Sequence, residues 1–112
     1  MATALATPDL DAAFAALADP TRRAIVAHLA SGEATVGELA APFTLTHQAI
    51  SHHVGILRRC GLIEQRVDGR RRPCRLRVEQ LEQLTDWIES QRRIWADRLE
   101  ALDAHLAEVE RP

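Results

Sequence analysis

The sequence predicts a mainly α-helical fold with one two-stranded β-hairpin, and three observations predict it. Proline, glycine and capping residues divide the 112 residues into short segments of helical periodicity. Between residues 62 and 78 the pattern becomes strand-like around Asp68-Gly69, a strong hairpin turn signal. From Glu79 onward apolar residues recur every seven positions. We expect a single domain over 1–112, with a core at 9–78, a hairpin at 62–78 and a C-terminal helix at 79–110.

Four helices are predicted before the hairpin. The first two are expected to start at Thr7-Pro8 and at Asp19-Pro20, where a capping residue precedes a proline, and Gly32 is expected to end the second. Their apolar positions are Leu10, Phe14, Leu17 and Ala18 in the first helix and Ile25, Val26 and Leu29 in the second.

The next two helices form a recognisable pair. Thr35 to Glu38 matches a capping box, which opens a short third helix that Pro42 ends. Thr46 is the expected N-cap of a fourth helix, which runs from His47 to about Cys60 and is closed by Gly61. A short helix, a tight turn and an amphipathic helix make a helix-turn-helix, and the basic hairpin after it makes a winged one.

Charge is distributed unevenly along the chain. The net charge is −2, and all fourteen basic residues are arginine. Residues 1–46 carry −3, residues 47–78 carry +6 and residues 79–112 carry −5. A basic centre between acidic flanks indicates a polyanionic partner, and the planar guanidinium group suits phosphate.

The fourth helix has two chemically different faces. At 100° per residue, Ile50, Val54 and Leu57 should face the core, and the acid-free opposite face should be exposed. We expect base-edge contacts from the start of this helix and phosphate contacts from its end and from the hairpin, with solvated charge as the alternative. The base-reading candidates are His47, Gln48, Ser51 and His52. The phosphate or wing candidates are Thr35, Thr46, Arg58, Arg59, Arg66, Arg70, Arg71 and Arg72. His53 is expected to be a packed or capping residue.

Two blocks, "ALADPTRRAIVAHL" and "AISHHVGILRRCGLI", carry a family resemblance. Over about residues 12–78 the chain resembles the ArsR/SmtB family of bacterial winged-helix repressors. The resemblance implies a homodimer joined through the first and last helices that represses promoters. It also places the DNA-reading positions on His47, Gln48, Ser51 and His52, although His52 stands where many relatives have a basic side chain.

The metal sites that the resemblance implies are incomplete in this sequence. No paired cysteines lie in Thr35–Ala41, and Asp103-Ala-His105 supplies only half of a tail-helix zinc site. We therefore expect no metal and no cofactor. Cys60 and Cys74 are interpreted as two small, semi-buried thiols, with a thiol switch as the alternative.

The C-terminal helix carries a broad apolar stripe that one domain would leave exposed. A two-fold homodimer would bury it. The expected dimer residues are Leu10, Phe14, Trp87, Ile88, Gln91, Trp95, Leu99, Leu102 and Leu106. No apolar run approaches the roughly 20 residues of a membrane span, and no basic segment opens the chain, so a cytoplasmic protein without a signal peptide is expected.

These observations predict a homodimeric, sequence-specific repressor that binds double-stranded DNA at an inverted repeat, with its effector unknown. Two alternatives stay open. The chain could be a protein-interaction module on a winged-helix scaffold, or a repressor that responds to a metal or thiol signal through a non-standard site. An enzyme is not expected, because the sequence has no glycine-rich phosphate loop and no nucleophile with an evident base.

Overall fold

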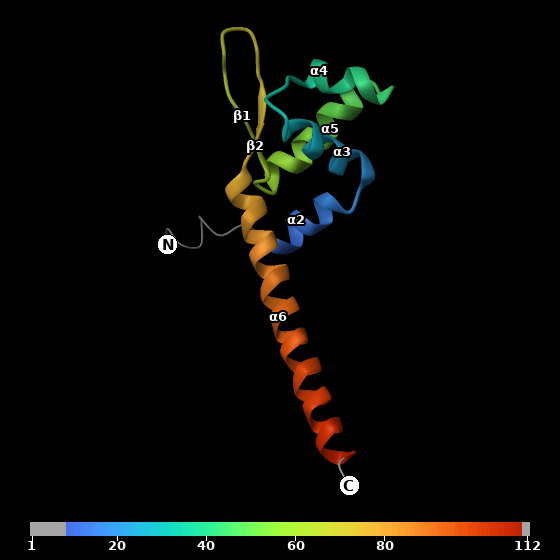
Figure 1. Cartoon of the computed structure of the whole chain (residues 1–112). Helices are drawn as coiled ribbons and strands as arrows, with labels where there is room; N and C mark the ends of the chain where they lie inside the picture. The colour runs from blue at the N-terminus through green and yellow to red at the C-terminus, as the bar shows by residue number, and fades with distance from the viewer. Residues whose placement is uncertain (1–8, 111–112) are drawn as a thin grey trace. The chain divides into compact units, whose positions relative to one another are not determined.

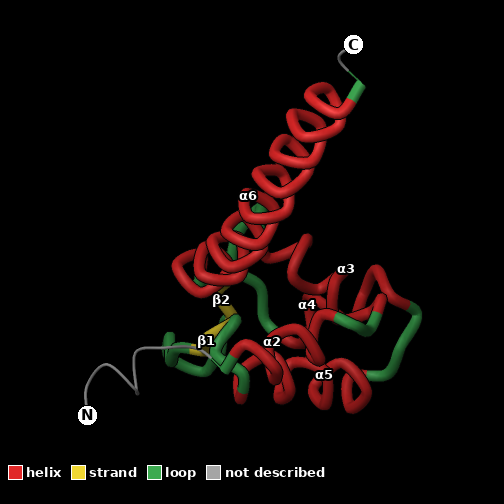
Figure 2. Tube along the Cα trace, turned by 90° about the horizontal axis from the view of Figure 1, so that it is seen from below, coloured by secondary structure: helices red, strands yellow, loops and turns green. Residues whose placement is uncertain are grey.

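The computed structural model describes residues 9–110. Its elements in chain order are α2 (Leu10–Leu17), α3 (Pro20–Leu29), α4 (Val36–Ala40), the 3₁₀ turn η1 (Ala41–Phe43), α5 (His47–Arg59), β1 (Ile63–Gln65), β2 (Cys74–Leu76) and α6 (Val78–Val109). Figure 1 shows this order, and Figure 2 shows that helices dominate the described chain. The mainly helical fold with one antiparallel hairpin is confirmed.

The chain divides into two compact units, Met1–Leu81 and Glu82–Pro112. In the first unit, α2, α3 and α4 pack with α5, and the hairpin packs with α3 and α5. The largest fully buried side chains of this core are Ile25, Leu39, Ile50, Leu57, Leu62, Ile63 and Cys74. In the second unit, residues 82–109 continue α6 as a regular helix.

The helix starts follow local capping chemistry. Asp19 caps α3 by accepting a hydrogen bond from the Arg22 amide at 3.0 Å, and Pro20 occupies the first helical position. The capping box of α4 is present in both directions. The expected start at Thr7-Pro8 lies outside the described residues; α2 is capped by Asp9.

The residues of α2 differ in burial: Ala13 and Ala16 are fully buried, Leu10, Phe14 and Leu17 are half-buried, and Ala18 at the C-cap is exposed. One expectation about the first half of the chain needs correction. Pro42 does not simply end α4, because the chain continues as the turn η1 before Thr44 adopts a left-handed conformation with φ of 51°.

The hairpin is shorter than its sequence pattern predicts, and its turn lies one residue later. Its register pairs Ile63 with Leu76 and Gln65 with Cys74. Asp68 and Arg71 then exchange two backbone hydrogen bonds of 3.0 and 2.9 Å, so the connecting residues are Gly69 and Arg70. Gly69 has φ of 63°, which glycine adopts without strain. Asp68 is therefore the last paired residue before the turn.

Candidate nucleic-acid interface

Helix α5 is positioned by its two ends and by its buried face. The Thr46 hydroxyl accepts from the Ala49 amide at 3.0 Å, and Gly61 follows the C-cap with φ of 85°. Ile50, Val54 and Leu57 are at most 3% exposed, as the periodicity predicts. His47, Gln48, Ser51, His52, Arg58 and Arg59 are all exposed. The first turns thus present imidazole, amide and hydroxyl groups outward, and the last turn presents two guanidinium groups.

A groove lies between the start of α5, the start of α4 and the hairpin. We call it the α5–hairpin groove. Its volume is about 560 Å³, and it is lined by Thr35, Val36, Gly37, His47, Ser51, Gln65, Arg70, Arg71 and Arg72. Predicted base-reading residues and predicted wing arginines from three separate segments therefore face one concave surface. Gln48 and His52 are exposed on α5 but do not line this groove.

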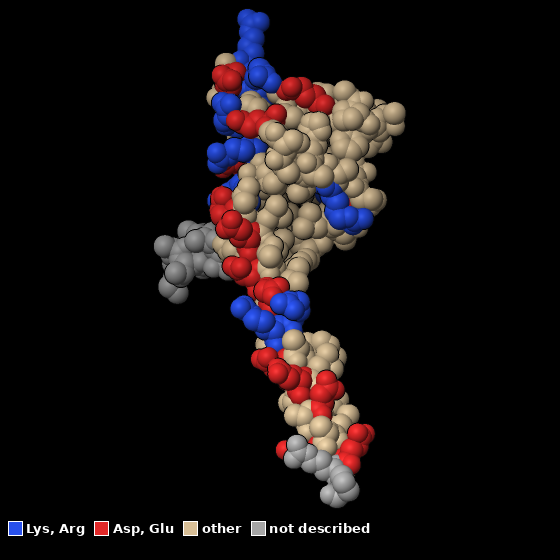
Figure 3. All heavy atoms as spheres, viewed as in Figure 1, with Lys and Arg blue, Asp and Glu red and all other residues tan. Residues whose placement is uncertain are grey.

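Carboxylates hold several arginines of the hairpin. Arg66 makes a two-pronged pair with Glu33, at 2.7 and 3.3 Å, and Arg71 Nη2 lies 2.6 Å from Glu38 Oε1. The hydrogen bond from Arg66 holds the pKa of Glu33 below its usual value. Figure 3 shows acidic side chains among the arginines gathered along the hairpin. These pairs lower the positive charge that the hairpin offers to a ligand.

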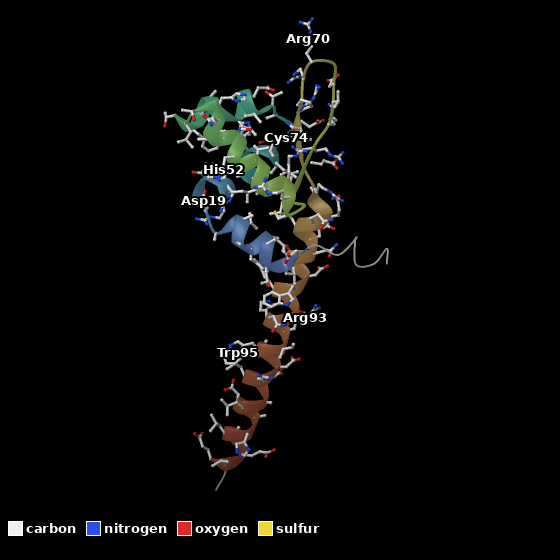
Figure 4. All side chains as sticks on the ribbon, turned by 180° about the vertical axis from the view of Figure 1, so that it is seen from behind. Asp19, His52, Arg70, Cys74, Arg93 and Trp95 are labelled. Atoms are coloured by element: carbon white, nitrogen blue, oxygen red, sulfur yellow. The ribbon has the colours of Figure 1, made fainter. Side chains whose placement is uncertain are left out.

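Within the described residues, the other arginines at the end of the hairpin have no carboxylate partner. Arg72 donates to the backbone oxygens of Gly69 and Arg71, at 3.1 and 3.0 Å. Arg70 occupies the tip (Figure 4), and among residues 9–110 it has no ion-pair or hydrogen-bond partner. Arg70 is therefore the most available cation of the hairpin.

Both threonines predicted as phosphate contacts act as helix caps. The Thr35 hydroxyl donates to Glu38 Oε1 at 3.0 Å and accepts from the Glu38 amide at 3.2 Å. The Thr35 amide also donates to the Glu38 carboxylate, and this bond is the main cause of the lowered pKa of Glu38, followed by the bonds from the Thr35 hydroxyl and from Arg71. The Thr46 hydroxyl accepts from α5 but keeps its own proton free for a second partner.

Helix α5 is tied to α2 and α3 through Arg22. Its guanidinium group donates to the backbone oxygens of Ala16 at 2.6 Å and Ala15 at 3.4 Å, and it lies 3.3 Å from His53 Nδ1. The same histidine nitrogen lies 4.0 Å from Asp19 Oδ2. His53 is thus a packed residue that links α5 to the neighbouring helices, as predicted.

Both cysteines are buried. Cys60 Sγ donates to the Leu57 oxygen at 3.3 Å, and Cys74 is fully buried in β2. Burial raises the pKa of Cys74 above its usual value, and the nearby charge of Arg58 only partly opposes this. The burial of both thiols, together with the raised pKa of Cys74, agrees with the structural interpretation.

The second unit carries the predicted apolar stripe. The exposed fractions are 46% for Trp87, 50% for Ile88, 61% for Trp95, 46% for Leu99, 51% for Leu102 and 47% for Leu106. Ile94 and Val109 extend the stripe. Helix α6 therefore presents a long row of apolar side chains that a partner surface can bury.

Sequence reasoning missed the residues that organise the hairpin. Glu33 and Glu38 were not recognised as arginine partners, and the antiparallel bridge between Ala34 and Cys74 was not predicted. The capping box already identified Glu38, but no local signal indicates that its carboxylate also reaches a residue 33 positions away.

No helix within residues 9–110 is both long and apolar enough to cross a membrane. No group of three or more His, Cys, Asp or Glu side chains in that range could hold a metal ion.

The fold and the α5–hairpin groove define a winged helix-turn-helix protein. A family model described as a helix-turn-helix domain matches residues 17–66. An ArsR-like transcriptional regulator from Rhodococcus sp. RHA1 has a solved structure that is 32% identical, with a TM-score of 0.77 over 85% of this chain and 90% of that one. The chain belongs to the ArsR family of transcriptional regulators.

Two further relatives show the extent of the similarity. The HTH-type transcriptional regulator Rv2034 of Mycobacterium tuberculosis is 47% identical over 62 residues, which are 55% of this chain and 58% of that protein. The homodimeric winged helix-turn-helix DNA-binding domain Mb0332 of Mycobacterium bovis is 26% identical, with a TM-score of 0.61 over 74% of this chain and 77% of that domain. The chain spans about three fifths of the length of Rv2034.

Proposed function

We propose that this chain is a homodimeric, sequence-specific repressor of transcription that acts in the cytoplasm on double-stranded DNA. The observation that carries the proposal is the α5–hairpin groove. It brings His47 and Ser51 of α5 together with Thr35 and with the arginines of the hairpin. A helix that enters the major groove while a basic hairpin contacts the adjacent backbone has this arrangement.

Each part of the interface has a distinct proposed role. His47, Gln48, Ser51 and His52 read base edges, because their side chains are exposed and offer donors and acceptors together. Arg70 and Arg72 contact phosphate from the hairpin, and Thr46 offers its hydroxyl proton at the start of α5. Thr35, Arg66 and Arg71 contribute less to DNA binding, because in the free protein their side chains are already bonded to Glu33 or Glu38.

The apolar stripe of α6 supports the homodimer. Eight large apolar side chains of α6 between Trp87 and Val109 are 46% exposed or more, and self-association would bury them. We propose that Leu10 and Phe14 of α2 join this interface together with Gln91 of α6. The homodimeric state of Mb0332 supports the same assembly. Two reading helices related by a two-fold axis predict an inverted-repeat operator with half-sites about one DNA turn, roughly 34 Å, apart.

The test begins with selection of bound fragments from genomic DNA by the purified full-length chain. The recovered sequences should share an inverted repeat. Fluorescence anisotropy on that site should then show that Gln48→Ala and His52→Ala weaken discrimination against altered half-sites by about 1–3 kcal/mol per lost base contact. His28→Ala is the matched control, because His28 is exposed on α3 and outside the groove. Recovery of fragments without a common sequence would refute sequence-specific binding.

Repression and the dimer need separate measurements. Transcription in vitro from a promoter that contains the operator should fall as the protein is added. Analytical ultracentrifugation at micromolar concentration should return about twice the 12.5 kDa chain mass. A monomer under these conditions would contradict the assembly but leave the DNA-reading surface open to test on half-sites.

A further inference from the structure

A second cavity lies at the other end of α5. It has a volume of about 460 Å³ and is lined by Gly55, Arg58, Arg59, Gly61, Ile63, Glu64, Gln65 and Arg77. We call it the arginine pocket. It shares Gln65 with the α5–hairpin groove, but none of its other lining residues. Arg58 lies about 16 Å along the helix from His47, at 1.5 Å per residue, and so is remote from the turn proposed to read bases.

The charge in the arginine pocket is unbalanced. Three guanidinium groups line it against the single carboxylate of Glu64. That carboxylate lies 2.5 Å from Arg75 outside the pocket and 4.0 Å from Arg77, which Glu79 also holds at 3.1 Å. Across residues 9–110, Arg58 and Arg59 have neither an ion-pair nor a hydrogen-bond partner for their side chains. Two uncompensated guanidinium groups at one concave surface favour an anion.

Two glycines, Gly55 and Gly61, line this pocket near Arg58 and Arg59. The guanidinium group of Arg59 lies back against α5 at Gly55, so that a Cβ atom added there would sit 3.2 Å from Arg59 Nη1. Gly61 carries the chain out of α5 with φ of 85°, a conformation that a side chain would strain. A Cβ atom at position 55 would require the guanidinium group of Arg59 to shift by a few tenths of an ångström.

We propose that the arginine pocket binds a phosphate group, with Arg58 and Arg59 as the binding residues and Gly55 as a positioning residue. Guanidinium donors match the oxygen geometry of a phosphate and bond it with charge assistance. The phosphate belongs either to the DNA backbone beside the operator or to a small phosphorylated ligand. Phosphate binding by the pocket is tested without DNA, so a failure of this proposal can be distinguished from a failure of the proposed DNA-binding function.

The experiment titrates inorganic phosphate into the ¹⁵N-labelled full-length chain at constant ionic strength and follows the amide resonances of Gly55 and Gly61. We expect saturable shifts at both glycines. Arg58→Gln and Arg59→Gln should each weaken phosphate binding at least tenfold. Arg93→Gln, which removes the same charge from α6, should leave it unchanged. Shifts that do not saturate, or equal affinity in the pocket variants and the wild type, would overturn the proposal.

Gly55→Ala separates positioning from folding. The added methyl should displace Arg59 and weaken phosphate binding severalfold, while the helix melts at the same or a higher temperature because alanine favours helix more than glycine does. In the Arg59→Gln background the same change should have no further effect on binding. An equal loss in both backgrounds would show that Gly55 does not act through Arg59 and would sink its assigned role.

Measurements of operator affinity distinguish the two possible sources of the phosphate. If it is the DNA backbone, free phosphate should compete with the operator and Arg59→Gln should flatten the salt dependence of operator affinity. If it is a small ligand, Arg59→Gln should leave operator affinity in phosphate-free buffer unchanged. Both outcomes support a phosphate site, and they differ only in its natural occupant.

Discussion

Two neighbouring arginines at the end of the hairpin should differ in their contribution to DNA binding. Arg70 has no partner in the described chain, whereas Arg71 Nη2 lies 2.6 Å from Glu38 Oε1. A cation that is free before binding adds its full charge to the DNA complex. A cation that is already paired adds little net charge, because its carboxylate partner remains beside it in the complex. We therefore expect Arg70→Gln to be costly and the paired change Glu38→Gln with Arg71→Gln to be nearly silent.

The magnitude follows from counterion release. If a dimer neutralises about six phosphates, the slope of log affinity against log salt is near −5, and affinity falls about a thousandfold between 50 and 200 mM salt. Arg70→Gln removes one phosphate contact per protomer, so the slope should become about −3. The affinity of this variant should then fall only about a hundredfold between 50 and 200 mM salt. The paired change keeps the local net charge, and its slope should stay within about 0.5 of the wild-type value.

The assay is fluorescence anisotropy on one labelled operator across that salt range, with circular dichroism to confirm equal folding. Gln at position 38 can keep the capping box, because glutamine also accepts from the N-cap amide. A paired variant whose slope falls as far as that of Arg70→Gln would refute the reasoning, since it would show that Arg71 leaves Glu38 to bind DNA.

Three further predictions concern stability and reactivity. Arg22→Ala removes donors from the oxygen of buried Ala16 and should lower the free energy of unfolding by about 1–3 kcal/mol in urea titrations; an unchanged midpoint would disprove the capping role. The lowered pKa of Glu33 and of Glu38 stabilises the fold above the ordinary carboxyl pKa of 4.5, and this stabilisation is lost as pH falls through the lower folded-state values. Urea midpoints should thus drop on acidification below about pH 4.5, less so in Glu38→Gln, and equal drops would refute the assignment. Cys74 should resist iodoacetamide in the native chain and react once unfolded, by mass spectrometry; fast native labelling would show that the thiol is not buried as described.

Arg22 shows how one side chain can join the candidate interface to the rest of the fold. It caps the end of α2 through the oxygens of Ala15 and Ala16 and meets His53 on α5. Arg23 donates to the Leu17 oxygen at 2.8 Å, so two consecutive arginines satisfy the carbonyl groups at the end of one helix. The orientation of α5 therefore depends on residues far from its exposed face.

The elements of the chain were largely predictable, because their limits depend on neighbours in sequence. Thr35, Thr46 and Gly61 act within three or four residues of the helix ends they define, and α5 begins and ends where these residues predict. Its buried face of Ile50, Val54 and Leu57 follows from a helical repeat alone. The hairpin was less predictable, since its regular strand ends at Gln65 and only an isolated bridge pairs Asp68 with Arg71, whereas the apolar pattern continues to Val67, which is 69% exposed.

Local signals in the sequence specify a helix with one apolar and one acid-free face, followed by a basic hairpin. Capping, turn formation and periodicity act over a few residues, so they can be read from the chain directly. Which arginines are available to a ligand depends instead on how the chain packs. Glu33 meets Arg66 and Glu38 meets Arg71 across 33 positions, and charge compensation of this kind depends on distances that only the packed chain fixes.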